Sequence, residues 1–196
     1  ALCDIVPAVK PQSAYYELLG PAGAGAFKKT ADYAKAKGLY VIADVKRGDI
    51  GSTAEAYSAA YLGGVKVGGT ELFPFDFDAI TVNGYLGSEG ITPFLETSIK
   101  RDKAIFVLVK TSNPSSAELQ DQEIGGRTLY TVVGDLLAEL SKDTVGAFGY
   151  SRIGAVVGAT YPDELKRLRQ RLRHTFFLVP GYGVQGGDAS DAAHAF

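Results

Sequence analysis

The sequence predicts an α/β fold in which the strands of a parallel sheet alternate with helices. Short apolar runs rich in Val, Ile or Phe recur along the chain, and longer segments with apolar residues at helical spacing separate them. Nearly continuous apolar runs are typical of strands buried on both faces, and such strands belong to parallel sheets. The six runs cover residues 2–9, 40–45, 79–82, 104–109, 153–157 and 176–179.

The segments between these runs are predicted helices, because their apolar residues recur every three or four positions. The last segment opens with Pro162 and two acids, an arrangement that favours a helix start. The predicted helices cover residues 26–37, 53–62, 129–141 and 162–172. Strand followed by helix, repeated about six times, fits either an open doubly wound sheet or a closed barrel. A barrel requires eight strands, so one strand would have to be missing at each end.

Composition narrows the class of protein. The chain has 196 residues, of which 46% are hydrophobic and 21% charged, as expected for one soluble globular domain covering residues 1–196. The net charge of -2 gives no reason to expect nucleic acid or an anionic membrane as a partner. One cysteine excludes an internal disulfide framework and fits a reducing compartment, so we expect a cytoplasmic protein. The chain begins with Ala1 and has no Met, so we expect its true N-terminus to be missing.

The densest polar signal follows the second apolar run. Asp44 and Lys46 point to the same side of a strand, at the end where active sites of parallel α/β folds lie. Asp49 follows in the turn, and Thr53 lies on the same face as Asp49 if the helix has started. The alternative is a strand-end ion pair with Thr53 or Ser52 as a helix N-cap.

Another charge closes the first apolar run. Lys10 follows the predicted strand 2–9, and a solvated strand end would be its simplest role. In a barrel, Lys10 would come from the strand adjacent to that of Asp44 and Lys46, and all three would face the same mouth.

The last apolar run leads into a glycine-rich segment, residues 178–188. Four glycines in seven residues allow backbone N–H groups to approach an anion closely, and a following helix start favours negative charge. We therefore expect a phosphate to lie against residues 183–187. Barrels often bind phosphate with the loops that follow their last strands. The alternative is a tight turn with Asp188 as a helix cap.

A hydroxyl-rich segment, residues 110–116, follows the fourth run and is suited to hydrogen-bonding a polar ring. A plain turn beginning at Asn113 and Pro114 is the alternative. One cysteine, Cys3, and two scattered histidines, His174 and His194, make no transition-metal site.

Taken together, these motifs resemble a known family. Asp44, Lys46 and Asp49 match the Asp-x-Lys-x-x-Asp signature of orotidine 5'-phosphate decarboxylases, in which a lysine from the preceding strand, here Lys10, completes an alternating Lys-Asp-Lys-Asp array. The resemblance to the bacterial-type branch runs from near the start to near the end of the chain. It includes the segments 46–51, 81–83 with 85–87, 110–114, 154–160 and 180–187.

The resemblance implies a (β/α)8 barrel and a reaction. Orotidine 5'-phosphate would lose CO2 to give uridine 5'-phosphate in pyrimidine biosynthesis, without metal or cofactor, and Lys46 would donate the proton. Asp44 would lie beside the substrate carboxylate, Lys10 would hold Asp44 and the ribose, and Asp49 with Thr53 would reach the neighbouring site of a homodimer. The substrate-binding residues implied by the resemblance are Thr53, Asn83, Ser112, Pro180, Gly183, Gln185 and Gly186, with Ser112 at the pyrimidine and Gln185 at the phosphate.

The chain departs from the family pattern in three places. Gly84 stands where family members usually have Pro. A strand with a ribose-binding Asp should precede Ala1, and an eighth strand with a phosphate-binding Arg should follow Phe196. The resemblance therefore implies a barrel whose first and last strands are missing from this chain.

Two other functions stay open. Keto-sugar-phosphate decarboxylases and hexulose-phosphate synthases of the same superfamily share the signature but need Mg2+, and they typically have Glu where this chain has Lys10. A non-catalytic nucleotide-phosphate binder is the second alternative, although all four charges of the array are present.

Overall fold

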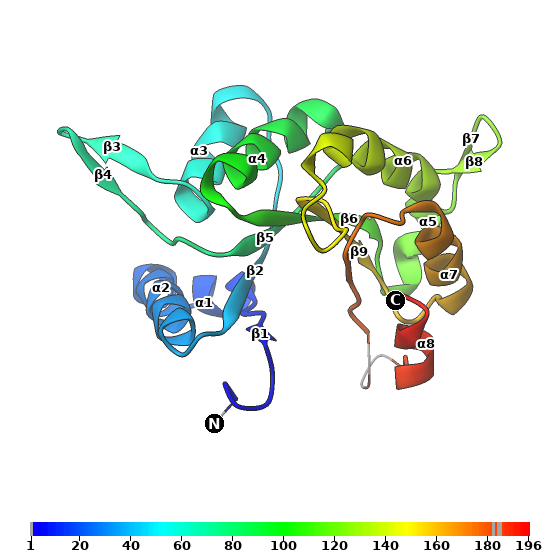
Figure 1. Cartoon of the computed structure of the whole chain (residues 1–196), viewed down its shortest axis with the longest axis horizontal. Helices are drawn as coiled ribbons and strands as arrows, with labels where there is room; N and C mark the ends of the chain where they lie inside the picture. The colour runs from blue at the N-terminus through cyan, green and yellow to red at the C-terminus, as the bar shows by residue number, and fades with distance from the viewer. Residues whose placement is uncertain (1, 182, 184–185) are drawn as a thin grey trace. The chain divides into compact units, whose positions relative to one another are not determined.

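The computed structural model describes residues 2–181, 183 and 186–196. It consists of two compact units, residues 1–105 and 106–196. The ribbon in Figure 1 shows the elements of each unit in chain order. None of the described helices is long and apolar enough to cross a membrane.

The first unit contains parallel strands connected by helices, as predicted. Its elements are β1 (Ala8–Val9), α1 (Ser13–Glu17), α2 (Gly20–Ala36), β2 (Tyr40–Arg47), α3 (Gly51–Tyr61), β3 (Val65–Val67), β4 (Thr70–Leu72), β5 (Ala79–Val82) and α4 (Ser88–Arg101). Strand β2 lies between β1 and β5 and pairs with both in parallel, while β3 and β4 form an antiparallel hairpin (Figure 1).

An aromatic cluster joins α2, the end of α3 and the segment that precedes β5. Phe27 of α2 and Phe77, which precedes β5, are almost fully buried, and their ring centroids are 4.8 Å apart. Tyr61, at the end of α3, stacks on Phe75 with centroids 5.0 Å apart. Burial of such large apolar side chains contributes about 1.5–3 kcal/mol each. The cluster thereby fixes α2 and α3 against the sheet whose strand ends carry the polar residues.

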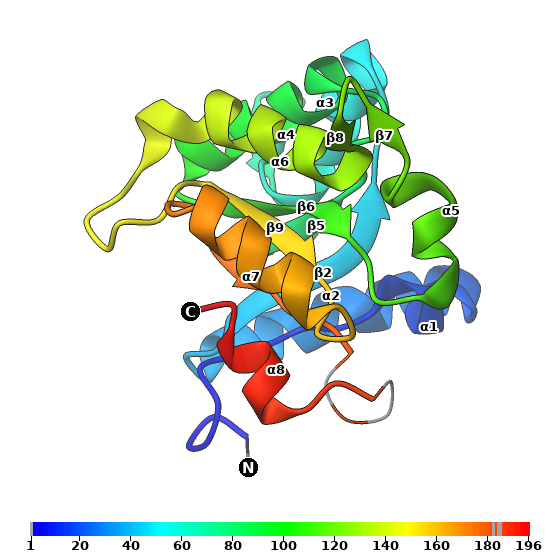
Figure 2. The ribbon, with the colours of Figure 1, turned by 90° about the vertical axis from the view of Figure 1, so that its right-hand side faces the viewer.

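The second unit repeats the strand and helix order. Its elements are β6 (Ala104–Lys110, which begins at the end of the first unit), η1 (Pro114–Ser116), α5 (Ala117–Gln120), β7 (Glu123–Ile124), β8 (Arg127–Thr128), α6 (Leu129–Ser141), η2 (Lys142–Thr144), β9 (Ile153–Val157), α7 (Pro162–Arg171), β10 (Phe177–Leu178) and α8 (Ala189–Ala193). Strands β9 and β10 pair in parallel, and β7 with β8 forms a hairpin. Helix α6 packs against β9, and α7 lies beside them (Figure 2).

Most of the predicted elements are confirmed, and the first strand is largely wrong. Residues 3–5 form a turn, because the amides of Ile5 and Val6 both donate to the carbonyl of Leu2, and Pro7 has no N–H for a ladder. Only Ala8–Val9 is strand. The helix predicted for residues 26–37 begins earlier, at Gly20, where Pro21 fits the first turn. Helix α4 and the two hairpins were not predicted.

Candidate active site

The ends of β1 and β2 bring three predicted residues together. Asp44 lies within β2 and is 7% exposed, whereas Lys10 and Lys46 lie at its two sides. Lys10 Nζ donates to Asp44 Oδ2 at 2.7 Å, and Lys46 Nζ donates to Asp44 Oδ1 at 2.6 Å. The prediction that Lys10, Asp44 and Lys46 meet at one end of adjacent parallel strands is therefore confirmed.

Parallel pairing explains why Lys10 reaches Asp44. Val9 stands opposite Val41, and the segment after β1 continues alongside β2, where Gln12 forms a bridge with Asp44. The amide of Asp44 donates to the carbonyl of Pro11 at 3.0 Å. Lys10, which directly follows β1, therefore lies beside the Asp44 carboxylate that it binds.

Two residues that the sequence interpretation missed complete the surroundings of Asp44. Gln12 Nε2 donates to Oδ2 at 3.0 Å, and Thr81 Oγ1 donates to Oδ1 at 3.0 Å. Each carboxylate oxygen therefore accepts one ammonium and one neutral donor. A sequence signal existed for Thr81, because it is the only polar side chain in the otherwise apolar strand β5.

The electrostatics of the cluster keep Asp44 ionised. Burial raises the pKa of the Asp44 carboxyl, but the hydrogen bonds and charges of Lys10 and Lys46 lower it more, so the pKa lies below its ordinary value. The Lys46 side chain is 47% exposed, so solvent reaches it. The arrangement offers a fixed anion beside a cation that can exchange its proton.

The backbone of Lys46 is unusual. Its φ is +44°, in the left-handed region that residues other than glycine rarely occupy, at a cost of about 1–3 kcal/mol. Such strain persists only where surrounding contacts hold it and is commonest at functional sites.

Asp49 and Thr53 do not join this cluster. Asp49 Oδ1 accepts from the amide of Ile50 at 2.9 Å, and the contacts described for this chain give the carboxylate no ion pair. Thr53 is exposed in the first turn of α3. The alternative prediction of Thr53 or Ser52 as the N-cap is wrong, because the cap residue is Ile50, without a side-chain bond.

Asn83 follows β5 and is exposed. Its Oδ1 accepts from the amide of Tyr85 at 3.0 Å, which forms a local turn through Gly84. The backbone N–H of Asn83 donates to the carbonyl of Arg47 at 2.7 Å. A Cβ added to Gly48 would lie 3.0 Å from the carbonyl oxygen of Asn83, so glycine allows this close approach at the end of β2.

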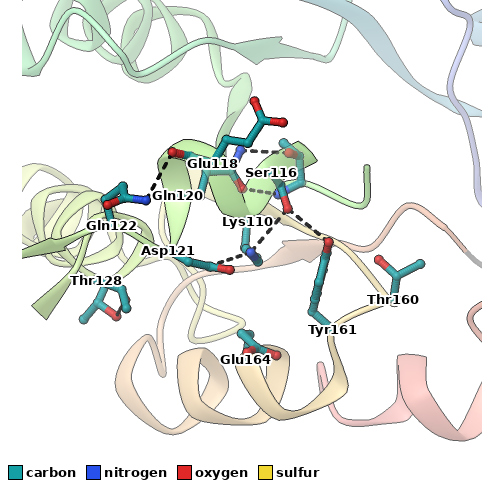
Figure 3. A network of polar contacts seen from close by, with 12 residues as sticks. Lys110, Ser116, Glu118, Gln120, Asp121, Gln122, Thr128, Thr160, Tyr161 and Glu164 are labelled. Atoms are coloured by element: carbon teal, nitrogen blue, oxygen red, sulfur yellow. Dashed lines mark hydrogen bonds and ion pairs between the residues drawn. The ribbon is translucent and has the colours of Figure 1, made fainter. Parts of the chain in front are cut away.

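In the second unit, Lys110 at the end of β6 anchors the hydroxyl-rich segment (Figure 3). Its side chain is fully buried, and Nζ donates to Asp121 at 2.6 Å and to Ser116 at 3.3 Å. The ring of Tyr161 lies 4.2 Å from the ammonium, a cation–π distance. Neither the buried state nor these contacts were predicted for Lys110.

Ser112 lies two residues beyond Lys110. Its carbonyl accepts from Thr160 Oγ1 at 3.1 Å. A Cβ on Gly158 would lie 2.8 Å from Cα of Ser112, so this glycine lets the segment pass close to the end of β9. No hydrogen bond of the Ser112 hydroxyl is among the contacts of the described residues.

The glycine-rich segment folds on itself. The carbonyl of Pro180 accepts from Ala159, and the amides of Gly183, Gly186 and Gly187 donate to carbonyls of residues 187, 183 and 181. Gly183 and Gly186 have φ of +82° and +98°, which glycine adopts without strain. Gln185 lies outside the described residues.

Asp188 is the N-cap of α8, as the alternative prediction held. Its side chain accepts from the amide of Asp191, whose carboxylate in turn accepts from the amide of Asp188. Two acids thus occupy the start of this five-residue helix. The described residues contain no group of three or more His, Cys, Asp or Glu side chains that could hold a metal ion.

Comparison with known proteins decides the family. A model of the family described as "Orotidine 5'-phosphate decarboxylase / HUMPS family" matches residues 1–195. This chain belongs to the orotidine 5'-phosphate decarboxylase / HUMPS family. A relative named orotidine 5'-phosphate decarboxylase, from Rhodopirellula baltica, is 48% identical over 195 residues, which cover 100% of this chain and 64% of the relative. The chain thus spans less than two thirds of that relative's length.

Solved structures of similar proteins show the fold of this family member. The Leishmania donovani OMP decarboxylase is 36% identical, with a TM-score of 0.71, over 89% of this chain and 62% of that protein. A Toxoplasma gondii protein provisionally described as an orotidine-monophosphate-decarboxylase is 34% identical, with a TM-score of 0.85, over 97% of this chain and 66% of that one. These similarities confirm the predicted fold class, α/β of the (β/α)8 barrel type.

Proposed function

We propose that this protein decarboxylates orotidine 5'-phosphate to uridine 5'-phosphate and CO2, as a carboxy-lyase of pyrimidine biosynthesis. Relatives carrying the decarboxylase name, such as that of Caldicellulosiruptor bescii at 50% identity, support the substrate. The observation that carries the proposal is the cluster of Lys10, Asp44 and Lys46, which places an ionised carboxylate between two ammonium groups.

The geometry supports a specific course for the reaction. The bond between C6 of the pyrimidine and the carboxylate breaks, CO2 leaves, and the electron pair stays on C6. The Lys46 ammonium donates its proton to C6, forms the new C–H bond, and is reprotonated from solvent. Fixed charges that already face the reacting carbon need no reorganisation as the negative charge develops, which is the electrostatic source of catalysis.

Asp44 acts on the substrate rather than on the proton. Its carboxylate would lie beside the substrate carboxylate, and this repulsion disappears when neutral CO2 leaves. The two lysines and the lowered pKa keep Asp44 charged at neutral pH, which this role requires. Lys10 holds Asp44 on the other oxygen and binds the ribose.

The remaining predicted residues bind substrate in this proposal. Asn83 and Ser112 provide polar groups for the nucleotide, with Ser112 at the pyrimidine edge. Pro180, Gly183, Gln185 and Gly186 form the segment that holds the phosphate. Remote phosphate binding can be used to raise the rate at the reacting carbon.

The protein would act as a cytoplasmic homodimer. Asp49 and Thr53 would reach the neighbouring subunit's site, and their positions in this chain support that role. Asp49 has no ion pair among the described contacts, and Thr53 is exposed on α3.

One assay tests the proposed activity. Loss of orotidine 5'-phosphate absorbance is followed with purified protein, with and without EDTA. We expect equal turnover in both, because side chains alone carry the chemistry. Turnover that EDTA abolishes and Mg2+ restores would favour the magnesium-dependent sister enzymes. Absence of turnover together with nucleotide binding would favour a non-catalytic binder.

A further inference from the structure

The pairing of β2 with β5 contains an irregularity at the candidate active site. Ile42 and Ala43 stand opposite Ala79 and Ile80, but the next pair is Arg47 with Val82. Residues 44–46 of β2 therefore stand opposite Thr81 alone. Such a bulge leaves backbone N–H groups of the longer strand without ladder acceptors, and buried N–H groups need a partner.

The Thr81 hydroxyl provides the missing acceptor. Its Oγ1 accepts from the amide of Val45 at 3.0 Å and from the amide of Lys46 at 2.8 Å. The same hydroxyl donates to Asp44 Oδ1 at 3.0 Å. A hydroxyl has one donor and two acceptor positions, so all three are used. Thr81 is 1% exposed, so water has little access to these bonds.

Thr81 thereby connects the two residues on which the proposed chemistry depends. The bond to the Lys46 amide restrains the backbone of a residue that has a left-handed φ of +44°. The bond to Asp44 fixes Oδ1, the oxygen that the Lys46 ammonium contacts at 2.6 Å. Loss of the hydroxyl would release the backbone and the carboxylate together.

We propose that Thr81 is a positioning residue, which orients Asp44 and Lys46 for proton transfer to the substrate. This role rests on the proposed function, because it concerns the same reaction. Thr81 acts through the two charged residues.

Three variants separate the hydroxyl from the shape of the side chain. Thr81→Val keeps the shape and removes the hydroxyl, whereas Thr81→Ser keeps the hydroxyl. Thr97→Val is the matched control, because it removes a first-unit hydroxyl that donates to the backbone carbonyl of Pro93 in helix α4, away from the Asp44 cluster. We expect Thr81→Val to lower kcat about 10- to 100-fold, since misplacement of a reacting group has effects of that size. KM should change less than about threefold, and the other two variants should stay within about threefold of wild type.

A second measurement does not depend on activity. The pKa of the Asp44 carboxyl is followed by carbon NMR in protein labelled at aspartate, with Asp44→Asn to assign the signal. Thr81→Val should raise this pKa, because a hydrogen bond to the ionised form is lost. Thr81→Ser and Thr97→Val should leave it unchanged. If Thr81→Val does not fold, Thr81→Cys is compared with Thr81→Ser, since the thiol has similar size and bonds weakly.

The outcomes distinguish the inference from the proposed function. Wild-type kcat in Thr81→Val, or an equal loss in Thr81→Ser, would overturn the positioning role. An unchanged Asp44 titration in Thr81→Val would also overturn it. If the wild-type protein does not turn over orotidine 5'-phosphate, the proposed function fails. A raised pKa of Asp44 in Thr81→Val would then still show that the Thr81 hydroxyl bonds to the Asp44 carboxylate.

Discussion

Replacement of Lys46 by alanine provides the sharpest test of the proposed proton donor. The change removes the ammonium that contacts Asp44 Oδ1 at 2.6 Å. The carboxylate keeps its bonds from Lys10, Gln12 and Thr81. The fold should therefore persist while the proton source is lost.

The structure sets different magnitudes for stability and catalysis. The Lys46 side chain is 47% exposed, so solvent screens its ion pair and the free energy of unfolding should fall by about 1 kcal/mol or less. General acids contribute about 10²- to 10⁴-fold to rate. At 1.36 kcal/mol per factor of ten, kcat should fall by an amount equivalent to about 2.7–5.4 kcal/mol.

The assay combines turnover with nucleotide binding. We expect Lys46→Ala to bind uridine 5'-phosphate nearly as wild type does. It should bind orotidine 5'-phosphate less well, because Asp44 then repels the substrate carboxylate with one cation fewer. Lys28→Ala is the matched control, since Lys28 forms an exposed ion pair with Asp32 at 3.0 Å on α2. Its turnover should equal that of wild type.

A clear result would refute the reasoning. Turnover of Lys46→Ala within about tenfold of wild type, or roughly 1.4 kcal/mol, would mean that another group donates the proton. Lys46 would then serve only as electrostatic support for Asp44.

Three further predictions concern stability. Burial raises the pKa of the Asp76 carboxyl, but hydrogen bonds from Lys35 and Lys103 lower this pKa more. The ionised carboxylate therefore stabilises the fold above its unfolded-state pKa of about 3.9, and this stabilisation is lost as the pH falls below that value. We therefore expect Asp76→Asn to make the free energy of unfolding depend less on pH in acid, and asparagine tolerates the positive φ of this position. An unchanged pH dependence in acid would contradict this prediction. Lys110→Met should lower the free energy of unfolding in urea by about 1–3 kcal/mol through loss of its buried bonds, and wild-type stability would show that they contribute little. Gly154→Ala should cost about 1–3 kcal/mol, because its Cβ would lie 2.8 Å from the carbonyl oxygen of Phe176. Gly25→Ala, with open space in α2, should instead stabilise by about 0.4–1 kcal/mol; equal thermal shifts for the two glycine variants would refute the packing argument.

Local sequence patterns were sufficient for most of the regular elements. The run 79–82 is β5, and the helix predicted for residues 129–141 is α6 with the same bounds. Helix α4 escaped prediction, because Pro93 lies inside it and is typical of a helix breaker. Its carbonyl accepts from Ser58 of the neighbouring helix α3, a contact that no local pattern reveals.

The amino-acid sequence by itself determined which charges could carry the chemistry. Strand alternation places Asp44 and Lys46 on one side, and the ends of adjacent parallel strands bring Lys10 beside them. The order of residues along the chain predicted the meeting of these three residues once a barrel was assumed, whereas the register shift at residues 44–46 was not predicted. The array's last member, Asp49, follows a turn, and its contacts depend on more than local geometry.

Only the tertiary structure decided how these charges are held. Thr81 lies 37 residues from Asp44 along the chain, and its three bonds depend on a shift of register between two strands. The bond from Gln12 to Asp44 and the bond from Lys110 to Asp121 could not be predicted from the sequence either. Each depends on which segments fold side by side. Hydrogen bonds require distances near 3 Å, and such distances between remote residues arise from packing, not from local residue order.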